Sequence, residues 1–245
     1  MSSTRPFLSL VMPAYNEEQT IGRSVSTVRN YLMKRGYPFE IIVVDDGSED
    51  QTLQRVQEVM ATCEKIRLVR NRKNLGKGAA VRKGMLHAEG EYIVFSDVDL
   101  SVSIDQIEPF LENLRDGYNI AIGSRRLNRS HIQDHQPIYR EMMGRAFTRL
   151  SRWILGTSTS DFTCGFKGFQ RDVARDLFAV QRLPDWSFDS EVIYLAGLRG
   201  YKIAQIPVTW SNGKETKVRL LRDIPLSLFG LLRIRLNKLM GKYGP

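Results

Sequence analysis

The chain has 245 residues, enough for one large α/β domain or two small ones that bury a substantial core. Its two cysteines are too few for a disulfide framework, and with 42% hydrophobic and 26% charged residues it has the composition of an ordinary soluble globular protein. The net charge of +9 predicts attraction to something anionic, which is nucleic acid, a membrane surface or a phosphorylated substrate.

Short apolar runs alternate with amphipathic helical patterns over the first 125 residues. Strands are predicted at 7–12, 39–44, 66–69, 92–95 and 118–122, and helices at 20–33, 50–63 and 104–114. A further helix is predicted to follow the basic loop 70–78 and to end at about residue 87. This alternation favours parallel βαβ units. The run at 39–44 is apolar almost throughout, which predicts a strand covered on both faces.

Acidic residues follow two of these predicted strands. Asp45 and Asp46 end the second strand, and Asp97 and Asp99 come directly after the fourth. Because ligands bind beyond the carboxyl ends of the strands in an open α/β sheet, both acidic loops and the loop at 13–18 should share one ligand-binding edge. The second acidic pair could hold a divalent cation, and the cation could hold a diphosphate. The alternative for either loop is a solvated turn or a helix cap.

The second half of the chain has a less regular pattern. The segment 128–136 is polar and predicted to be flexible, and 137–155 is predicted to be a helix with one apolar and one arginine-rich side. A turn and a strand are predicted at 161–169, helices at 172–180 and 190–198, and a strand at 204–210. Pro207 interrupts this last strand, which predicts an edge strand or a bend.

The C-terminal tail is basic and contains one short apolar stretch. Between residues 214 and 242 it has eight Lys and Arg and two Asp and Glu, a net charge of +6. The stretch 224–232 is too short to span a bilayer, so we expect it and the helix at 137–155 to lie on a membrane surface. The alternative is a helix docked on the core. The chain begins without the apolar segment of a signal peptide, and we expect a peripheral protein on the cytoplasmic side of a membrane.

Six motifs occur in order at the positions of the predicted loops. They lie at 11–17, 43–48, 74–80, 97–101, 123–125 and 164–167. Together they resemble the family 2 glycosyltransferases, and more narrowly the dolichyl-phosphate and polyprenyl-phosphate sugar transferases, over residues 7–218. Within that group the segments 76–82 and 164–167 look more like the dolichyl-phosphate beta-glucosyltransferases. Val98 departs from the pattern because alanine is usual there.

The resemblance implies a glycosyltransferase A fold, which is a Rossmann-like, mostly parallel sheet flanked by helices. It implies a catalytic domain at 1–218, with a nucleotide-binding half at 1–125 and an acceptor half at 126–218, followed by a basic amphipathic tail at 219–245. Some relatives carry transmembrane helices in the tail, and this chain has no such stretch there. It is therefore expected to bind the membrane peripherally or through an anchoring partner.

The implied reaction transfers a hexose, best glucose from UDP-glucose, to a dolichyl or polyprenyl phosphate with inversion at the anomeric carbon. A Mg²⁺ or Mn²⁺ ion at Asp97 and Asp99 would stabilise the departing diphosphate. Tyr15 would stack on the nucleotide, and Glu17 would accept hydrogen bonds from its hydroxyl groups. The residues expected to contact the nucleotide sugar are Pro13, Ala14, Tyr15, Glu17, Val44, Asp45, Asp46, Lys77, Asp97, Val98 and Asp99.

Arg125, Arg140 and Lys217 are expected to bind the acceptor phosphate, and with Asp97 and Asp99 they are the expected catalytic residues. The second pKa of a phosphate monoester is about 6, so the acceptor is mostly a dianion at neutral pH and needs no strong general base. It does need cations, because two anions that repel each other must be brought together.

Several further charged residues are secondary candidates. Arg126 and Arg145 are weaker candidates for the acceptor phosphate. If Asp161, Asp189 or Glu191 takes part, we expect it to orient these cations rather than to abstract a proton.

Other functions remain open from the sequence. A GDP-mannose-dependent polyprenyl-phosphate mannosyltransferase, or a transferase that makes polysaccharide or modifies protein, would use similar motifs. A nucleotidyltransferase is disfavoured because a Gly-rich loop after the first strand is missing. A nucleic-acid-binding protein would suit the charge. However, the basic residues lie beside leucines and the sheet edge is acidic, so we expect no nucleic-acid partner.

Overall fold

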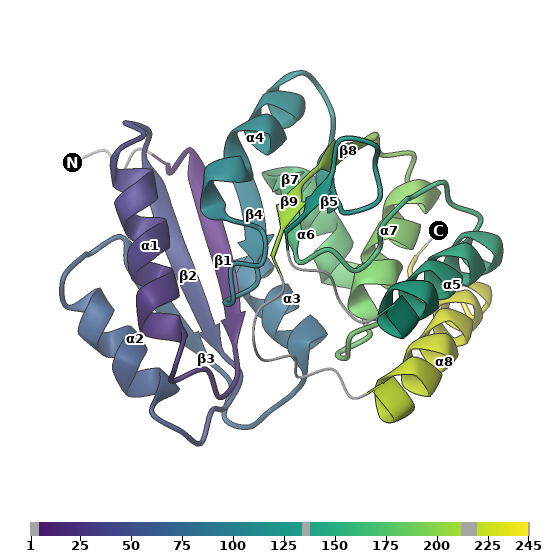
Figure 1. The fold of residues 1–245 in the computed structure, drawn as a ribbon, viewed down its shortest axis with the longest axis horizontal. Helices are drawn as coiled ribbons and strands as arrows, with labels where there is room; N and C mark the ends of the chain where they lie inside the picture. Colours follow the sequence, from purple (N-terminus) through teal and green to yellow (C-terminus); the bar gives the residue numbers. More distant parts are fainter. Residues whose placement is uncertain (1–4, 134–137, 212–219, 245) are drawn as a thin grey trace.

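The computed structural model describes residues 5–133, 138–211 and 220–244, and the side chains of residues 138, 140 and 220–225 lie outside this description. A seven-stranded sheet in the order β3-β2-β1-β4-β7-β5-β8 runs through the molecule, with helices on both faces (Figure 1). Its strands are β1 (Leu8–Ala14), β2 (Phe39–Asp45), β3 (Ile66–Arg70), β4 (Tyr92–Ser96), β5 (Ile120–Ser124), β7 (Phe166–Gln170) and β8 (Ile203–Pro207).

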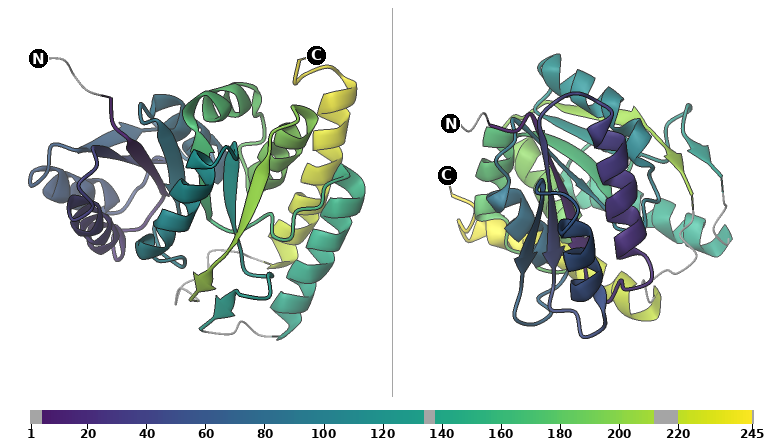
Figure 2. Two further views of the ribbon diagram at one scale, coloured as in Figure 1. Left: turned by 90° about the horizontal axis from the view of Figure 1, so that it is seen from above. Right: turned by 90° about the vertical axis from the view of Figure 1, so that its left-hand side faces the viewer.

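Two layers of helices cover the two faces of the sheet (Figure 2). Each layer packs on the sheet around a separate apolar core. One core contains side chains of α1 (Ile21–Met33), α2 (Thr52–Met60) and α4 (Ile107–Arg115), which follows the short 3₁₀ helix η1 (Ile104–Gln106). The other contains side chains of α3 (Lys77–His87), α5 (Ile138–Leu155), α6 (Arg171–Val180), α7 (Phe188–Leu198) and α8 (Leu220–Leu239). The fully buried β2 strand between these layers confirms the prediction made from its apolar run.

Strands β1 to β4 are mutually parallel, so the loops after β1, β2 and β4 lie at one edge of the sheet, as predicted. β7 is antiparallel and lies between β4 and β5. A strand from the second half of the chain therefore sits in the middle of the sheet, and the two predicted halves, 1–125 and 126–218, share one sheet. Their boundaries remain a prediction.

Pro13 does not end the first strand, which continues to Ala14. The carbonyl of Ala14 accepts a hydrogen bond from the Asp46 amide on the β2 side. Since neighbouring residues of a strand point their backbone groups to opposite sides, the nitrogen of Pro13 faces the β4 side, beyond the last β1–β4 pair at Val11 and Phe95. The proline therefore costs the sheet no hydrogen bond.

The segment predicted to be flexible contains a strand. β6 (His131–Ile132) pairs in parallel with β9 (Thr209–Trp210) to form a small second sheet. The prediction was wrong there because two residues are too few to show a periodic pattern, and the pairing partner is distant in the sequence. The edge position of β8, by contrast, confirms the prediction made from Pro207.

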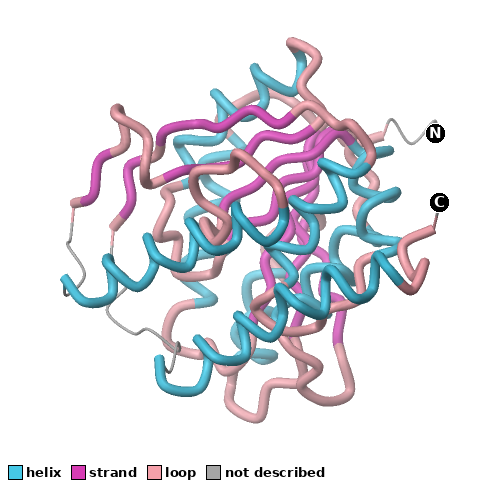
Figure 3. The backbone as a smooth tube through the Cα atoms, turned by 90° about the vertical axis from the view of Figure 1, so that its right-hand side faces the viewer, coloured by secondary structure: helices cyan, strands magenta, loops and turns pink. Residues whose placement is uncertain are grey.

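The helix α8 is docked on the core and also exposes apolar side chains. It packs beside α5 and against α7 (Figure 3), and Leu231 and Ile234 are fully buried in the core. On the opposite side of α8 an exposed stripe is formed by Leu226, Phe229, Leu232, Leu236 and Leu239. Within the described ranges, none of the helices is both long and apolar enough to cross a membrane.

Candidate active site

The acidic pair lies at the carboxyl end of β4, where the backbone turns sharply. The amide of Asp97 donates to the carbonyl of Gly165 at 3.0 Å, and Leu100 adopts a positive φ of 50°. Asp99 is exposed, and its Oδ1 accepts a hydrogen bond from the Ser101 amide at 3.0 Å. Partial desolvation by the surrounding protein, together with the charge of Asp97, raises the pKa of Asp99 above its ordinary value. Both carboxylates therefore stand at the predicted ligand edge.

Lys77 is the first residue of α3 and contacts Asp97 of the acidic pair directly. Its Nζ lies 2.7 Å from Oδ1 of Asp97 and 4.6 Å from the ring centroid of Trp186. Burial alone would lower the pKa of Lys77, but the carboxylates of Asp97, Asp189 and Asp99 raise it above its ordinary value. Lys77 is therefore a firmly charged ammonium group at the start of a helix, where an anion is also stabilised by the helix dipole.

The segment Cys164–Lys167 shapes the other wall of the acidic site. A Cβ at Gly165 would overlap the carboxylate of Asp97, so only glycine leaves room for that side chain. Two residues later Lys167 is fully buried, with Nζ 2.6 Å from the Cys164 carbonyl and 2.5 Å from Oδ1 of Asp189. Burial raises the pKa of Asp189 in spite of the two nearby lysines, Lys167 and Lys77. This ion pair ties β7 to the first turn of α7.

Asp45 and Asp46 are buried, and protein donors occupy their carboxylate oxygens. Asp45 accepts from the Ser48 amide at 3.0 Å and from Nε of Arg70 at 3.0 Å. Asp46 accepts from Nδ2 of Asn71 at 2.7 Å and from the amides of Leu75 and Gly76, the latter at 2.8 Å. In this structure both aspartates hold the loop that leads into Lys77. A contact of either carboxylate with the nucleotide remains a prediction.

The loop after β1 is held against the start of α2. The Asn16 amide donates to the Ser48 hydroxyl at 2.9 Å, and the Glu17 amide donates to the Thr52 hydroxyl at 2.7 Å. Asn16 adopts a positive φ of 51°, which turns the chain there. Tyr15 and Glu17 are both partly exposed at the edge where the acidic pair lies, and their predicted roles toward a nucleotide stay predictions.

Two predicted nucleotide contacts have their side chains in the core. Val98 is 4% exposed and packs in the core under α1 and α4, while Val44 is fully buried on the face covered by α3. The side chains of Val44 and Val98 thus pack in the core, and a contact of either residue with the nucleotide sugar stays a prediction. Val44 lies in β2, which is buried on both faces, whereas Val98 lies in the turn after β4, where its side chain folds back into the core.

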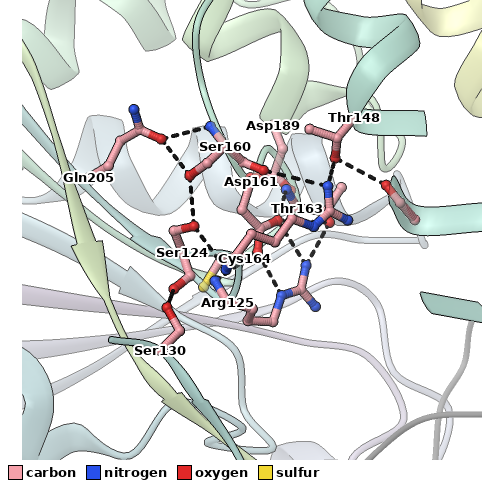
Figure 4. Close-up of polar contacts among 12 residues, drawn as sticks. Ser124, Arg125, Ser130, Thr148, Ser160, Asp161, Thr163, Cys164, Asp189 and Gln205 are labelled. Carbon is pink, nitrogen blue, oxygen red and sulfur yellow. Dashed lines mark hydrogen bonds and ion pairs between the residues drawn. The ribbon is translucent and has the colours of Figure 1, made fainter. Parts of the chain in front are cut away.

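Arg125, at the end of β5, is held by a buried carboxylate (Figure 4). Its Nε and Nη2 donate to the two oxygens of Asp161 at 2.7 and 2.9 Å, and Nη2 also donates to the Thr163 hydroxyl at 2.9 Å. Asp161 is fully buried; burial alone would raise its pKa, but Arg125 and Arg126 hold that pKa well below the usual range. The side chain of Arg125 remains one-fifth exposed.

Further arginines gather beside this pair. Arg126 donates to the Thr148 hydroxyl on α5, and burial together with the charges of Arg125, Arg145 and Arg152 lowers its pKa. The charges of Arg125 and Arg145 both act on Arg126, and the weaker candidacy of Arg126 and Arg145 for the acceptor phosphate stays a prediction. Arg140 belongs to α5, but its side chain lies outside the described residues, and so does all of Lys217.

A divalent metal fits the donor set at the acidic edge. The described residues hold no group of three or more His, Cys, Asp or Glu side chains that could enclose an ion. Asp97 and Asp99 instead offer two carboxylates at an open edge. Magnesium and manganese sites of transferases are often of this kind, with substrate phosphates and water completing the coordination.

Sequence reasoning missed Trp186, which stands against Lys77 and is 41% exposed. The expectation that Asp161 would orient a cation is confirmed, but the sequence did not show that its partner would be Arg125, 36 residues away. The available sequence signal for Trp186 was its position after Pro184 and Asp185, just before a helix. Nothing local could reveal the pairing of Arg125 with Asp161.

Comparison with known proteins shows which of them this chain resembles. The sequence profile of glycosyl transferase family 2 matches residues 9–178. A dolichyl-phosphate beta-glucosyltransferase of Trichomonas vaginalis is 32% identical over 93% of this chain and 72% of its own length. The dolichyl-phosphate beta-glucosyltransferase of Homo sapiens is 31% identical over 86% of this chain and 69% of its own length.

A solved structure shows the same fold. Glucosyl-3-phosphoglycerate synthase from Mycobacterium tuberculosis, crystallised with Mn²⁺, uridine diphosphate and phosphoglyceric acid, superposes with a TM-score of 0.66. The match covers 98% of this chain and 79% of that chain at 21% identity. At this identity the likeness is evidence for the fold, and it confirms the predicted glycosyltransferase A architecture.

Proposed function

The chain belongs to glycosyl transferase family 2, and we propose that this glycosyltransferase transfers glucose from UDP-glucose to a dolichyl or polyprenyl phosphate. The transfer inverts the anomeric carbon and gives a β-linked lipid-phosphate sugar and UDP. The observation that carries the proposal is the acidic pair Asp97 and Asp99 at the sheet edge, with the ammonium of Lys77 2.7 Å from Asp97. Arg125 belongs to the same region, because the charge of Asp97 helps to raise the pKa of its guanidinium. The similarity to dolichyl-phosphate beta-glucosyltransferases supports the choice of lipid phosphate and sugar.

On the donor side, Asp97 and Asp99 would hold a Mg²⁺ or Mn²⁺ ion, which supplies electrostatic stabilisation of the departing diphosphate. Lys77 lies 2.7 Å from Asp97 and would bind the diphosphate as a second cation. Tyr15 and Glu17, on the neighbouring loop, would hold the nucleoside. Asp45 and Asp46 act by fixing the loop that presents Lys77.

On the acceptor side, Arg125 would bind the lipid phosphate, with Arg140 and Lys217 as further cations. A phosphate oxygen would attack the anomeric carbon as the bond to UDP breaks. Asp161 is unsuited to be a general base because Arg125 keeps its pKa far below neutral. It holds the guanidinium in place instead, and the dianionic acceptor needs no base.

The outer helices would hold the enzyme at the lipid acceptor. The exposed stripe of α8 places apolar side chains beside Arg233 and Arg235. This combination of apolar and basic side chains is typical of an interfacial helix. On α5, Met142 and Trp153 are 65% and 82% exposed. We infer a peripheral enzyme on the cytoplasmic side of a membrane, with an anchoring partner as a further means of attachment.

A donor screen tests the proposed reaction. The purified protein is incubated with Mn²⁺ or Mg²⁺, a polyprenyl phosphate and either UDP-glucose, GDP-mannose or UDP-N-acetylglucosamine, and the glycolipid is quantified. We expect product with UDP-glucose at a rate at least about tenfold above the other donors. Product mainly from GDP-mannose would reject the proposed donor, and no product with any donor would reject the lipid-phosphate acceptor.

A further inference from the structure

The loop 183–187, between α6 and α7, is packed tightly against the first turn of α3. The Pro184 carbonyl accepts a hydrogen bond from the Ala79 amide at 3.2 Å. A Cβ at Gly76 would lie 2.5 Å from the Pro184 carbonyl oxygen, and one at Gly78 would lie 2.5 Å from that of Leu183. The loop 183–187 therefore requires glycine on both sides of Lys77. The proposed reaction itself assigns this loop no role.

The same loop is held from its other side by α8. Oδ2 of Asp185 lies 3.4 Å from Nη1 of Arg233, and Ser187 fills the space that a side chain at Gly230 would need. The Ser187 amide also donates to Oδ1 of Asp185 at 2.8 Å. The loop is thus wedged between α3 and α8, and the position of Trp186 at its centre is set from both sides.

The indole ring of Trp186 forms one wall around the ammonium of Lys77. The side chain of Lys77 is 15% exposed, and its Nζ is held between Oδ1 of Asp97 and the face of the ring. A bound metal would compete with Lys77 for Asp97, and a bound diphosphate, as an anion, would compete with Asp97 for Lys77. The neutral ring takes part in neither exchange, so it keeps holding the ammonium without neutralising its charge.

We propose that Trp186 is a positioning residue for Lys77, which it keeps directed at the diphosphate of the donor. The proposal rests on the proposed function, because it assigns Lys77 to the donor diphosphate. In this proposal the ring of Trp186 affects the donor only through Lys77. The alternative is that the ring contacts the sugar or the lipid chain directly. Those direct contacts would give a different pattern of coupling between the two residues.

A double-mutant cycle with UDP and MnCl₂ tests the proposal. Calorimetry measures UDP affinity for the wild type, Trp186→Leu, Lys77→Met and the double variant. Loss of the ring should weaken UDP binding about three- to tenfold, which is the range of a partly exposed cation–π contact. If Trp186 acts through Lys77, the double variant should bind UDP no more weakly than Lys77→Met alone. Additive losses, or full affinity in Trp186→Leu, would overturn the proposal.

An aromatic series guards against a folding defect in the leucine variant. Trp186→Tyr and Trp186→Phe retain a flat ring, and their UDP affinities should fall between those of the wild type and the leucine variant, in the order of cation–π strength. If all the variants at position 186 bound UDP with the same affinity, the role of Trp186 would be rejected, but the UDP-sugar function would not. If the wild type itself binds no UDP in the presence of MnCl₂, the UDP-sugar function fails, and this inference fails with it.

Discussion

At the scale of single residues, the two carboxylates of the acidic pair have different surroundings. Asp97 is confined by Lys77 and by the backbone of Gly165, whereas Asp99 is exposed and bound within its own turn by Ser101. Asp97 therefore contacts both α3 and the turn before β7, whereas the exposed carboxylate of Asp99 has room for a ligand. This difference allows Asp99 to be removed without disturbing the fold.

Asp99→Ala should reduce glucosyl transfer at least about 100-fold, because one of the two proposed metal ligands is lost. The melting temperature should change little, since the side chain is exposed and its hydrogen bonds come from Ser101 of its own turn. The measurement is product formation with UDP-glucose beside a thermal melt. Asp116→Ala, at an exposed position after α4, is the control that should leave transfer unchanged. Wild-type activity of Asp99→Ala would refute the metal assignment.

Arg125→Ala by itself would mix two effects, because it leaves the fully buried Asp161 without its partner. Breaking a buried pair in this way typically costs about 3–5 kcal/mol of stability. The double variant Arg125→Met/Asp161→Asn removes both charges instead. It should raise the KM for polyprenyl phosphate or lower acceptor-dependent turnover more than tenfold, with UDP affinity changed less than about twofold.

A KM for polyprenyl phosphate that stays at the wild-type value in this double variant, with unchanged turnover, would reject the acceptor role. Asp161→Asn alone is the matched comparison. It retains the cation of Arg125, so it should keep most of the acceptor affinity, provided that the melt shows a folded protein.

The two thiols should differ sharply in reactivity. Burial, with the charge of Asp161 next in importance, raises the pKa of Cys164 to about 12, whereas Cys63 is partly exposed. At pH 8 only about one in ten thousand Cys164 side chains would be thiolate, the form that reacts. An aromatic disulfide reagent should therefore titrate one thiol rapidly in the native protein and two after denaturation. In Cys63→Ser the rapid phase should vanish; rapid reaction of two thiols in the native wild type would contradict the burial of Cys164.

At the scale of elements, β7 supports the acidic site from within the sheet. It runs antiparallel between β4 and β5, so that the turn before it meets the carboxyl end of β4. Gly165 in that turn leaves room for Asp97, and Lys167 in the strand pairs with Asp189 of α7. The Cys164–Lys167 motif therefore shapes the site around Asp97 and joins it to α7.

Gly165→Ala should lower turnover about 100-fold, since a displacement of about 1 Å at a catalytic group can have that effect. The backbone at Gly165 is not left-handed, so alanine there disturbs the site by overlap with Asp97 alone. Steady-state kinetics and a thermal melt measure both consequences. Gly197→Ala in α7 is the control, because open space surrounds that position. If Gly165→Ala kept wild-type turnover, Asp97 would have no catalytic role that depends on its position.

At the scale of the whole molecule, α5 and α8 form an outer layer beside the sheet (Figures 1 and 3). One side of α8 completes the core through Leu231 and Ile234, and the other carries the exposed apolar stripe. The predicted alternatives for the tail, a docked helix and a surface for membrane, therefore concern opposite sides of the same helix. Removing residues 219–245 would damage the core as well as the stripe.

Point substitutions separate these two roles of α8. Phe229→Glu/Leu232→Glu places two carboxylates on the exposed stripe and should abolish co-sedimentation with vesicles that contain phosphatidylserine, because apolar contact is lost and like charges repel. Met33→Glu/Tyr118→Glu adds the same charge at exposed positions elsewhere and should retain binding. Vesicle binding that survives the substitutions in α8 would assign the stripe to another partner.

The sequence by itself determined the element order of the first 125 residues and the shared edge of the acidic loops. Apolar runs such as 39–44 need cover on both faces, and parallel strands bring their carboxyl ends together, so the Asp97–Asp99 pair could be placed from pattern alone. Only the tertiary structure decided that Asp161 holds Arg125, that Trp186 meets Lys77 and that Val98 turns into the core. Periodicity reports the face of an element, whereas these contacts join residues far apart in the chain, whose proximity depends on how the elements pack.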